Sequence, residues 1–129
     1  MMDVRHIEIA PITLEWSDWF AWSRFELDAR SDPESVILPD SPGVYEARLI
    51  DNDERLTIGR ASNLRMRVKQ GLVKGKVPHS SGKNIRESED VSLIVIRWAV
   101  TDRPAAVEEE LHRRHAEFFG RLPKYTERT

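Results

Sequence analysis

The alternation of apolar and polar positions predicts three strands, the first of which begins at Gly43. Residues 43–50 (GVYEARLI) and 54–60 (ERLTIGR) are rich in β-favouring residues, and the turn sequence DND separates them. This pattern predicts a hairpin. Residues 91–100 (VSLIVIRWAV) are apolar enough for a central, buried strand. Together they predict a small, mainly antiparallel three-stranded sheet.

Helical signals follow the hairpin. Ser62 or Asn63 suits an N-cap, the next apolar positions, Leu64 and Val68, share a helical face, and Gly71 suits the helix end. The stretch at 74–84 (KGKVPHSSGKN) is expected to be a flexible basic loop.

A second helix is predicted after the last strand. Asp102 and Pro104 indicate its start, and Gly120 indicates its end. Its expected inward side chains are Val107, Leu111 and Phe118 or Phe119. The order of elements predicts an α/β (α+β) fold in which helices flank the sheet.

Residues 1–41 are acidic and rich in tryptophan, unlike the rest of the chain. This difference predicts an N-terminal helical extension that precedes a main domain at residues 42–129. The extension holds three of the four tryptophans, Trp16, Trp19 and Trp22, whose spacing of three predicts one helical face. We favour packing of this face on the sheet. A base-stacking surface, or a contact with a protein partner or a second copy of the chain, is the alternative.

Charge is distributed unevenly along the chain. Residues 1–54 contain 4 Lys and Arg against 13 Asp and Glu, a net charge of −9, and residues 55–129 contain 16 against 9, a net charge of +7. Nine Lys and Arg and no acidic residue occur within 55–86. A stretch with only positive charges forms either a solvated surface or a binding surface for a polyanion, and nucleic acid is the first candidate for that polyanion.

Other bulk features narrow the class of protein. The 129 residues are enough for one domain with a modest core. The chain has no cysteine, which is typical of a reducing cytosol, so a cytoplasmic protein is expected. No apolar run has the length of a membrane span, and no secretory signal is visible.

Four polar residues are expected to converge on this fold. Tyr45 lies on the first core strand and Thr57 on its hairpin partner, while Arg67 and Glu108 come from the two helices. A guanidinium can hold a phosphate oxygen in a forked pair. A lone carboxylate suits a largely hydrated Mg²⁺ that also binds phosphate oxygens. A phenol, a guanidinium and a carboxylate therefore suit phosphodiester cleavage.

These residues carry a resemblance to the GIY-YIG nuclease family, over roughly residues 42–126. GVY at 43–45 resembles the first triplet, and TIG at 57–59 resembles the second, with Thr57 in place of a tyrosine. Arg67 lies ten residues after Thr57, as in the family, and Glu108 lies three residues before a leucine. LPKYT at 122–126 resembles the closing Pro-x-Tyr-Asn element, with Thr126 in place of asparagine.

The resemblance implies an endonuclease that uses a single Mg²⁺ or Mn²⁺ ion to hydrolyse DNA, including branched or damaged DNA, in a setting such as DNA repair. Tyr45 would act as general base or orient the attacking water, Arg67 would bind the scissile phosphate, and Glu108 would bind the metal. Gly71 stands where the family often has His or Tyr, and His79 is expected to substitute for it. The expected DNA-binding residues are Arg60, Arg65, Lys69, Lys74, Lys76, Lys83 and Thr126.

Two alternatives remain open from the sequence. A degenerate site could bind nucleic acid without cutting it, because Thr57 keeps a hydroxyl but lacks a ring. Alternatively, Glu108, His112 and His115 share a helical face on which Zn²⁺ could bind. Glu109 and Glu110 are the substitutes for Glu108 as the metal ligand.

Overall fold

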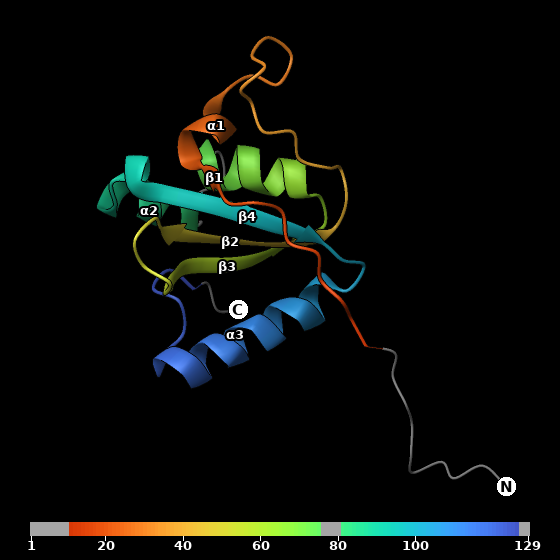
Figure 1. Cartoon of the computed structure of the whole chain (residues 1–129), viewed down its shortest axis with the longest axis vertical. Helices are drawn as coiled ribbons and strands as arrows, with labels where there is room; N and C mark the ends of the chain where they lie inside the picture. Colours follow the sequence, from red (N-terminus) through yellow and green to blue (C-terminus); the bar gives the residue numbers. More distant parts are fainter. Residues whose placement is uncertain (1–10, 76–80, 127–129) are drawn as a thin grey trace, which may run out of the picture.

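A four-stranded antiparallel sheet forms the centre of the molecule (Figure 1). The computed structural model describes residues 11–75 and 81–126. The strands lie in the order β1-β4-β2-β3. Their bounds are β1 Phe20–Ala21, β2 Gly43–Leu49, β3 Arg55–Ala61 and β4 Ile94–Val100. The predicted hairpin and central strand are confirmed, and β1 adds a fourth strand that the sequence did not predict.

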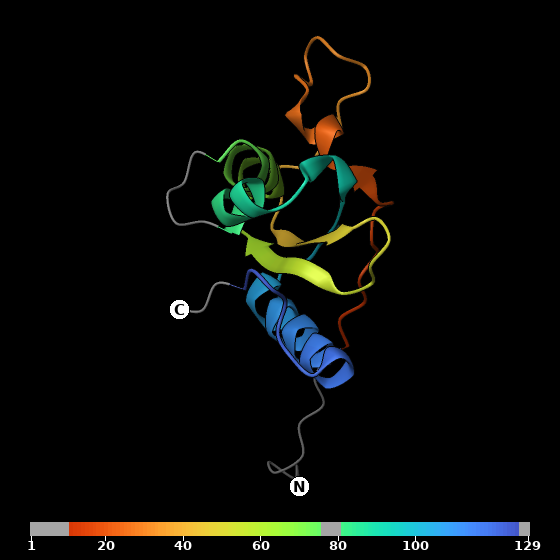
Figure 2. The same cartoon turned by 90° about the vertical axis from the view of Figure 1, so that its left-hand side faces the viewer.

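Helices cover both faces of this sheet, which confirms the predicted fold class. Their bounds are α1 Trp22–Glu26, the π-helix η1 Arg65–Val73, α2 Ser81–Ser88, the short 3-10 turn η2 Val91–Leu93 and α3 Pro104–Phe119. Figure 2 shows η1 and α2 on one side of the sheet and α3 on the other. None of the helices in the described part of the chain is long and apolar enough to cross a lipid bilayer.

The two faces of the sheet bury different clusters. On the core face, Tyr45 and Ala47 of β2 join the main hydrophobic core with side chains of α1, η1 and α2. On the α3 face, Val44 of β2 and Ala99 of β4 pack against Val107 of α3. Because side chains alternate along a strand, residues of β2 with odd numbers face the core and those with even numbers face α3.

The predicted N-terminal helix is much shorter than expected. Only α1 is helical there, and residues 11–19 form neither helix nor strand. The segment instead lies along β4: Phe20 pairs with Ile96, and the Ser17 amide donates to the Trp98 carbonyl at 2.8 Å. Hydrogen bonds to a strand, together with the modest helix propensity of Trp, Ser, Asp and Phe, explain why the local pattern did not decide the structure.

The three tryptophans therefore do not share one helical face. Trp22 is buried in the main core, whereas Trp16 packs against the cluster on the α3 face. The Trp19 ring lies on the same face, with its centroid 4.4 Å from the guanidinium carbon of Arg48. All three tryptophan rings nevertheless pack on the sheet, which is the interpretation that we favoured. The division of the chain at residue 42 stays a prediction.

Helix η1 begins as predicted but ends later. Asn63 caps it, since its side-chain oxygen accepts from the Met66 amide at 3.0 Å. Gly71 does not end the helix, which continues to Val73 and closes with a bond from the Lys74 amide to the Lys69 carbonyl at 3.1 Å. This bond spans five residues, the spacing of a π-helix.

Part of the predicted basic loop is helical. Helix α2 takes up residues 81–88, and residues 76–80 lie outside the described residues. Gly82 permits the close approach of α2 to η1, because a Cβ atom there would lie 2.3 Å from the Leu72 carbonyl oxygen. Ile85 is then fully buried in the core.

Helix α3 has the predicted limits. Pro104 lies in its first turn, and Gly120, with a φ of 77°, forms its left-handed C-cap. Val107 is buried and Leu111 is partly buried, as predicted. Of the two phenylalanines proposed to face inward, Phe119 is partly buried and Phe118 is 81% exposed.

Candidate active site

The Tyr45 and Arg67 side chains meet on the core face. Tyr45 belongs to the central strand β2 and is only 3% exposed. Arg67 lies in the first turn of η1, and its Nε atom donates a hydrogen bond to the Tyr45 hydroxyl at 3.2 Å. Two of the residues predicted from the sequence are therefore in direct contact, although they are separated by 22 positions in the chain.

Gly59 explains how the Tyr45 ring can lie where it does. Gly59 is the register partner of Tyr45 on β3. A Cβ atom at position 59 would lie 2.3 Å from both the Cζ and the hydroxyl oxygen of Tyr45. The tyrosine ring therefore extends sideways across the glycine, and no other residue type leaves that space open. This role of Gly59 was not predicted from the sequence, although the register across the predicted hairpin pairs Gly59 with Tyr45.

Thr57 does not join this pair. It is buried, and its hydroxyl donates to the Tyr125 carbonyl at 3.4 Å. We expected this hydroxyl to reach water or phosphate. Its proton is directed to a backbone carbonyl, and its role at the site stays a prediction. The Tyr125 amide in turn donates to the Leu56 carbonyl at 2.8 Å, so the C-terminal segment lies along β3 and covers Thr57.

Tyr125 also holds helix α2 in place. Its carbonyl accepts from the Ser81 hydroxyl at 2.7 Å, and its own hydroxyl donates to Glu89 at 2.5 Å. Hydrogen bonds from Lys124 and Tyr125 hold the pKa of Glu89 below its ordinary value, while burial and the bond to Glu89 raise the pKa of Tyr125. Ser81 and Glu89 were not predicted as partners of Tyr125, because no local pattern signals contacts between residues more than 35 positions apart.

Thr126 makes a local contact only. Its hydroxyl donates to the Pro123 carbonyl at 2.7 Å, which closes the turn at the end of the described residues. This bond occupies the group that we expected to contact DNA. Its role in DNA binding stays a prediction.

Glu108 shares a face of helix α3 with His112 and His115, and this face lies against the edge strand β3. The Nε2 atom of His115 accepts from the Arg55 amide at 3.2 Å, and that of His112 donates to the Ile58 carbonyl at 3.0 Å. Helix α3 and strand β3 therefore run side by side in opposite directions: His115 lies beside Arg55, and His112 lies beside Ile58. One further helical turn brings Glu108 towards the end of β3 that contains Gly59.

These histidine contacts contradict the zinc alternative. His115 is buried, and its second nitrogen, Nδ1, donates to the Arg121 carbonyl at 2.8 Å, so both ring nitrogens bind backbone groups. Within residues 11–75 and 81–126, no group of three or more His, Asp or Glu side chains is placed to hold a metal ion. A site of this kind does not fit zinc, which takes several protein ligands.

The residues present do fit a largely hydrated ion held through one carboxylate. Glu108 is partly buried, and no hydrogen bond or ion pair engages its carboxylate among the described residues. Glu110 differs, because hydrogen bonds from Arg113 and Arg114 lower its pKa to about 2 and occupy its oxygens. Glu109 is exposed. Of the three glutamates, Glu108 is thus the one with a partly buried carboxylate that no described residue engages, and its role as metal ligand stays a prediction.

The predicted DNA-binding residues lie in different environments. Arg60, Lys74 and Lys83 are exposed, and Arg65 is exposed but donates to Asp40 at 2.7 Å. Lys76 lies outside the described residues, as does the predicted catalytic residue His79.

Lys69 contradicts the expectation that it contacts DNA. It is 6% exposed, and its ammonium donates to the Ser35 hydroxyl at 2.8 Å and to the Leu27 carbonyl at 3.0 Å. Burial lowers its pKa. Lys69 therefore fastens the loop before β2 to helix η1, and the uniform sign of the basic stretch hid this difference.

Comparison with known proteins gives one structural similarity. No family model matches the chain, and a search of curated proteins finds no match. Among solved structures, the chain is similar to a crystal structure of the GIY-YIG N-terminal endonuclease domain of UvrC from Thermotoga maritima, a point mutant bound to its catalytic divalent cation. The two chains share 22% sequence identity, with 71% of this chain and 89% of that chain covered, at a TM-score of 0.49.

Proposed function

We propose that this chain is a divalent-metal-dependent endonuclease that hydrolyses phosphodiester bonds in DNA. The observation that carries the proposal is the 3.2 Å hydrogen bond between Arg67 and Tyr45, held above Gly59. A phenol and a guanidinium that converge from separate elements, with a carboxylate on helix α3 across the edge strand β3, are the groups that such a hydrolysis needs.

Arg67 is proposed to bind the scissile phosphate. A guanidinium matches phosphate oxygens in a forked pair of hydrogen bonds and offsets the negative charge that grows in the transition state. Its position is fixed at both ends: the backbone belongs to η1, and Nε is bound to Tyr45. A donor fixed in this way needs little reorganisation when the phosphate binds.

Tyr45 is proposed to orient or deprotonate the attacking water. Its oxygen accepts the bond from Arg67, which directs its own O–H away from the guanidinium. Burial of the ring fixes the hydroxyl beside the proposed phosphate site. A water held there would be placed for attack on a phosphate bound by Arg67.

Glu108 is proposed to hold the divalent ion. When bound, a Mg²⁺ or Mn²⁺ ion would lower the pKa of a water ligand and stabilise the leaving oxygen. The proposed role of Glu108 is to supply a negatively charged oxygen to this ion, at the end of β3 near Gly59. Exposed Arg60, Lys74 and Lys83 would add a sequence-independent attraction to the DNA backbone.

A DNA-binding module without nuclease activity is the second candidate function. The buried Thr57 favours it, because it brings no phenol ring to this position and its hydroxyl donates to the Tyr125 carbonyl. Loss of one contributing group would lower the rate and leave the basic surface able to bind.

Incubation with plasmid and branched DNA separates the two functions. We expect cutting with Mg²⁺ or Mn²⁺ and none when EDTA removes the metal. Binding that weakens steeply as salt rises, without cutting under any metal condition, would replace the nuclease with the binding module. Absence of both cutting and binding would contradict both functions.

A further inference from the structure

The Tyr45 ring has different neighbours on its two sides within the sheet. On β3 its register partner is Gly59, which has no side chain, and on β4 its register partner is Trp98. Side chains of directly opposed residues lie about 5 Å apart at Cβ and contact one another. Trp98 is therefore the cross-strand neighbour of Tyr45 on the side away from Gly59.

The N-terminal segment holds Trp98 through rings and backbone. The Phe20 ring stacks on Trp98 with centroids 5.6 Å apart, and the Phe25 ring meets it edge-on at 6.2 Å. The Ser17 amide donates to the Trp98 carbonyl at 2.8 Å, and the Trp98 amide donates to the Ser17 hydroxyl at 3.0 Å. Both the ring and the backbone of Trp98 are thus fixed by residues that precede the family resemblance.

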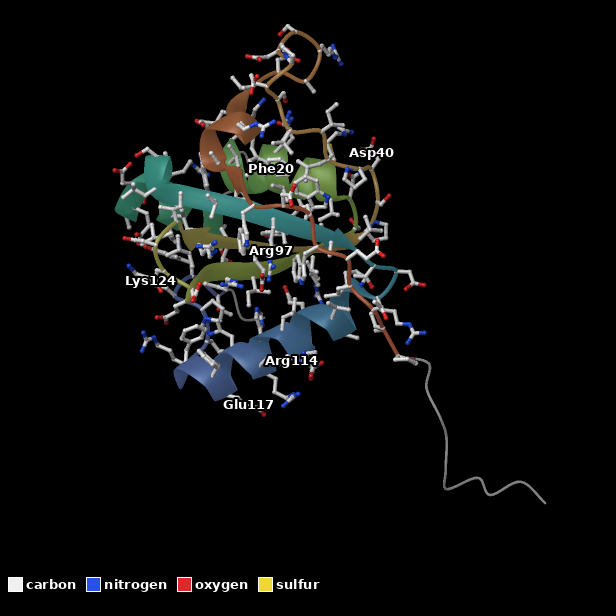
Figure 3. All side chains as sticks on the ribbon, in the orientation of Figure 1. Phe20, Asp40, Arg97, Arg114, Glu117 and Lys124 are labelled. Carbon is white, nitrogen blue, oxygen red and sulfur yellow. The ribbon has the colours of Figure 1, made fainter. Side chains whose placement is uncertain are left out.

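The same segment is anchored on the opposite face of the sheet. The guanidinium carbon of Arg97 lies 4.1 Å from the Trp16 ring centroid and 4.6 Å from that of Trp19. Arg97 in turn donates to the buried Glu46 carboxylate at 2.8 Å. In Figure 3, Phe20 and Arg97 lie on opposite sides of the β4 ribbon. The segment therefore passes around the outer edge of β4 and contacts both of its faces.

We propose that Trp98 is a positioning residue for Tyr45, and that residues 16–25 act as a brace that fixes Trp98. This inference rests on the proposed function of Tyr45. It gives the N-terminal segment a part in the reaction: the segment keeps the phenol in line with Arg67 although it contributes no group to the pocket. Displacement of a reacting group by about 1 Å can lower a rate about 100-fold, so support of this kind affects turnover.

Three variants test the brace. Phe20→Ala removes the ring stacked on Trp98, and Trp98→Leu removes the support itself. Phe119→Ala is the matched control, because it deletes a phenylalanine ring that packs on His115 of α3 instead. Thermal unfolding identifies the variants that remain folded, and Phe20→Ala, on the partly exposed strand β1, keeps the test available if Trp98→Leu does not fold.

Two measurements are made on each folded variant. The first is kcat and KM for DNA cleavage. The second is the ¹⁹F NMR spectrum of protein labelled with 3-fluorotyrosine, which reports on the Tyr45 environment without any substrate. The chain has only two tyrosines, so the same label in a Tyr125→Phe protein assigns the Tyr45 signal.

We expect Phe20→Ala and Trp98→Leu to lower kcat about tenfold or more, with KM changed less than about twofold. Their Tyr45 signal should shift or broaden, and Phe119→Ala should change neither quantity. An unchanged Tyr45 signal in folded Phe20→Ala and Trp98→Leu would overturn the brace. If the unmodified protein does not cut DNA, the proposed function fails, while the ¹⁹F signals still decide whether the brace exists.

Discussion

Replacement of Gly59 by alanine is expected to abolish most DNA cleavage while the protein stays folded. The new Cβ atom would lie 2.3 Å from the Cζ and hydroxyl oxygen of Tyr45, so the ring must move away from its present position. That movement breaks the hydrogen bond to Arg67 and displaces the phenol from the phosphate site. We expect kcat to fall at least about 100-fold. The free energy of unfolding should fall by about 1–3 kcal/mol, the usual cost of overpacking.

Gly71→Ala is the matched control for this variant. Gly71 is also buried, but a Cβ atom there would meet only the Arg67 side chain, at an ordinary contact distance of 3.6 Å. Cleavage should therefore stay within about twofold, and helix propensity should leave stability equal or slightly higher. Equal kcat values for Gly59→Ala and the unmodified protein would show that the Tyr45 position is not needed for cleavage.

Replacement of Glu108 by glutamine is expected to have the second large effect. The change keeps the size of the side chain and removes the charge that would attract a divalent cation. We expect kcat/KM at a fixed Mg²⁺ concentration to fall by about 100-fold to 1,000-fold, the range found when one major electrostatic contact to a transition state is lost. DNA affinity without metal should not weaken, since the variant removes a negative charge.

Glu110→Gln on the same helix controls for a general effect of charge. The Glu110 carboxylate binds Arg113 and Arg114, which lower its pKa to about 2, and it is separated from Glu108 by two positions. Its removal breaks surface ion pairs that contribute little to stability. Cleavage should be nearly unchanged. A larger loss in Glu110→Gln than in Glu108→Gln would reassign the metal ligand to Glu110.

Much of the fold could be predicted because its signals are local. The DND turn between two β-rich stretches sets the hairpin, and Pro104 and Gly120 set the limits of α3. The contact of Tyr45 with Arg67 was predicted as a convergence in space, and it follows from the hairpin register and from the start of η1 after β3. These features depend on residues close together in the sequence or directly paired across one turn.

The remaining features depend on partners far along the chain. Residues 14–21 take their conformation from β4, whose pairing residues lie more than 70 positions away, so the helical spacing of the tryptophans was misleading. The Thr57 hydroxyl binds Tyr125, 68 positions away. Lys69 turns inward because the loop at Leu27 and Ser35 supplies its acceptors. No local pattern distinguishes such a buried lysine from its exposed neighbours.

The position of a bound Mn²⁺ ion tests the central claim most directly. A crystal soaked with Mn²⁺ would be measured for its anomalous signal. We predict one ion bound to a Glu108 carboxylate oxygen at about 2.0–2.3 Å, at the end of β3 that contains Gly59. An ion bound elsewhere, with Glu108 making no contact to it, would contradict the proposed active site.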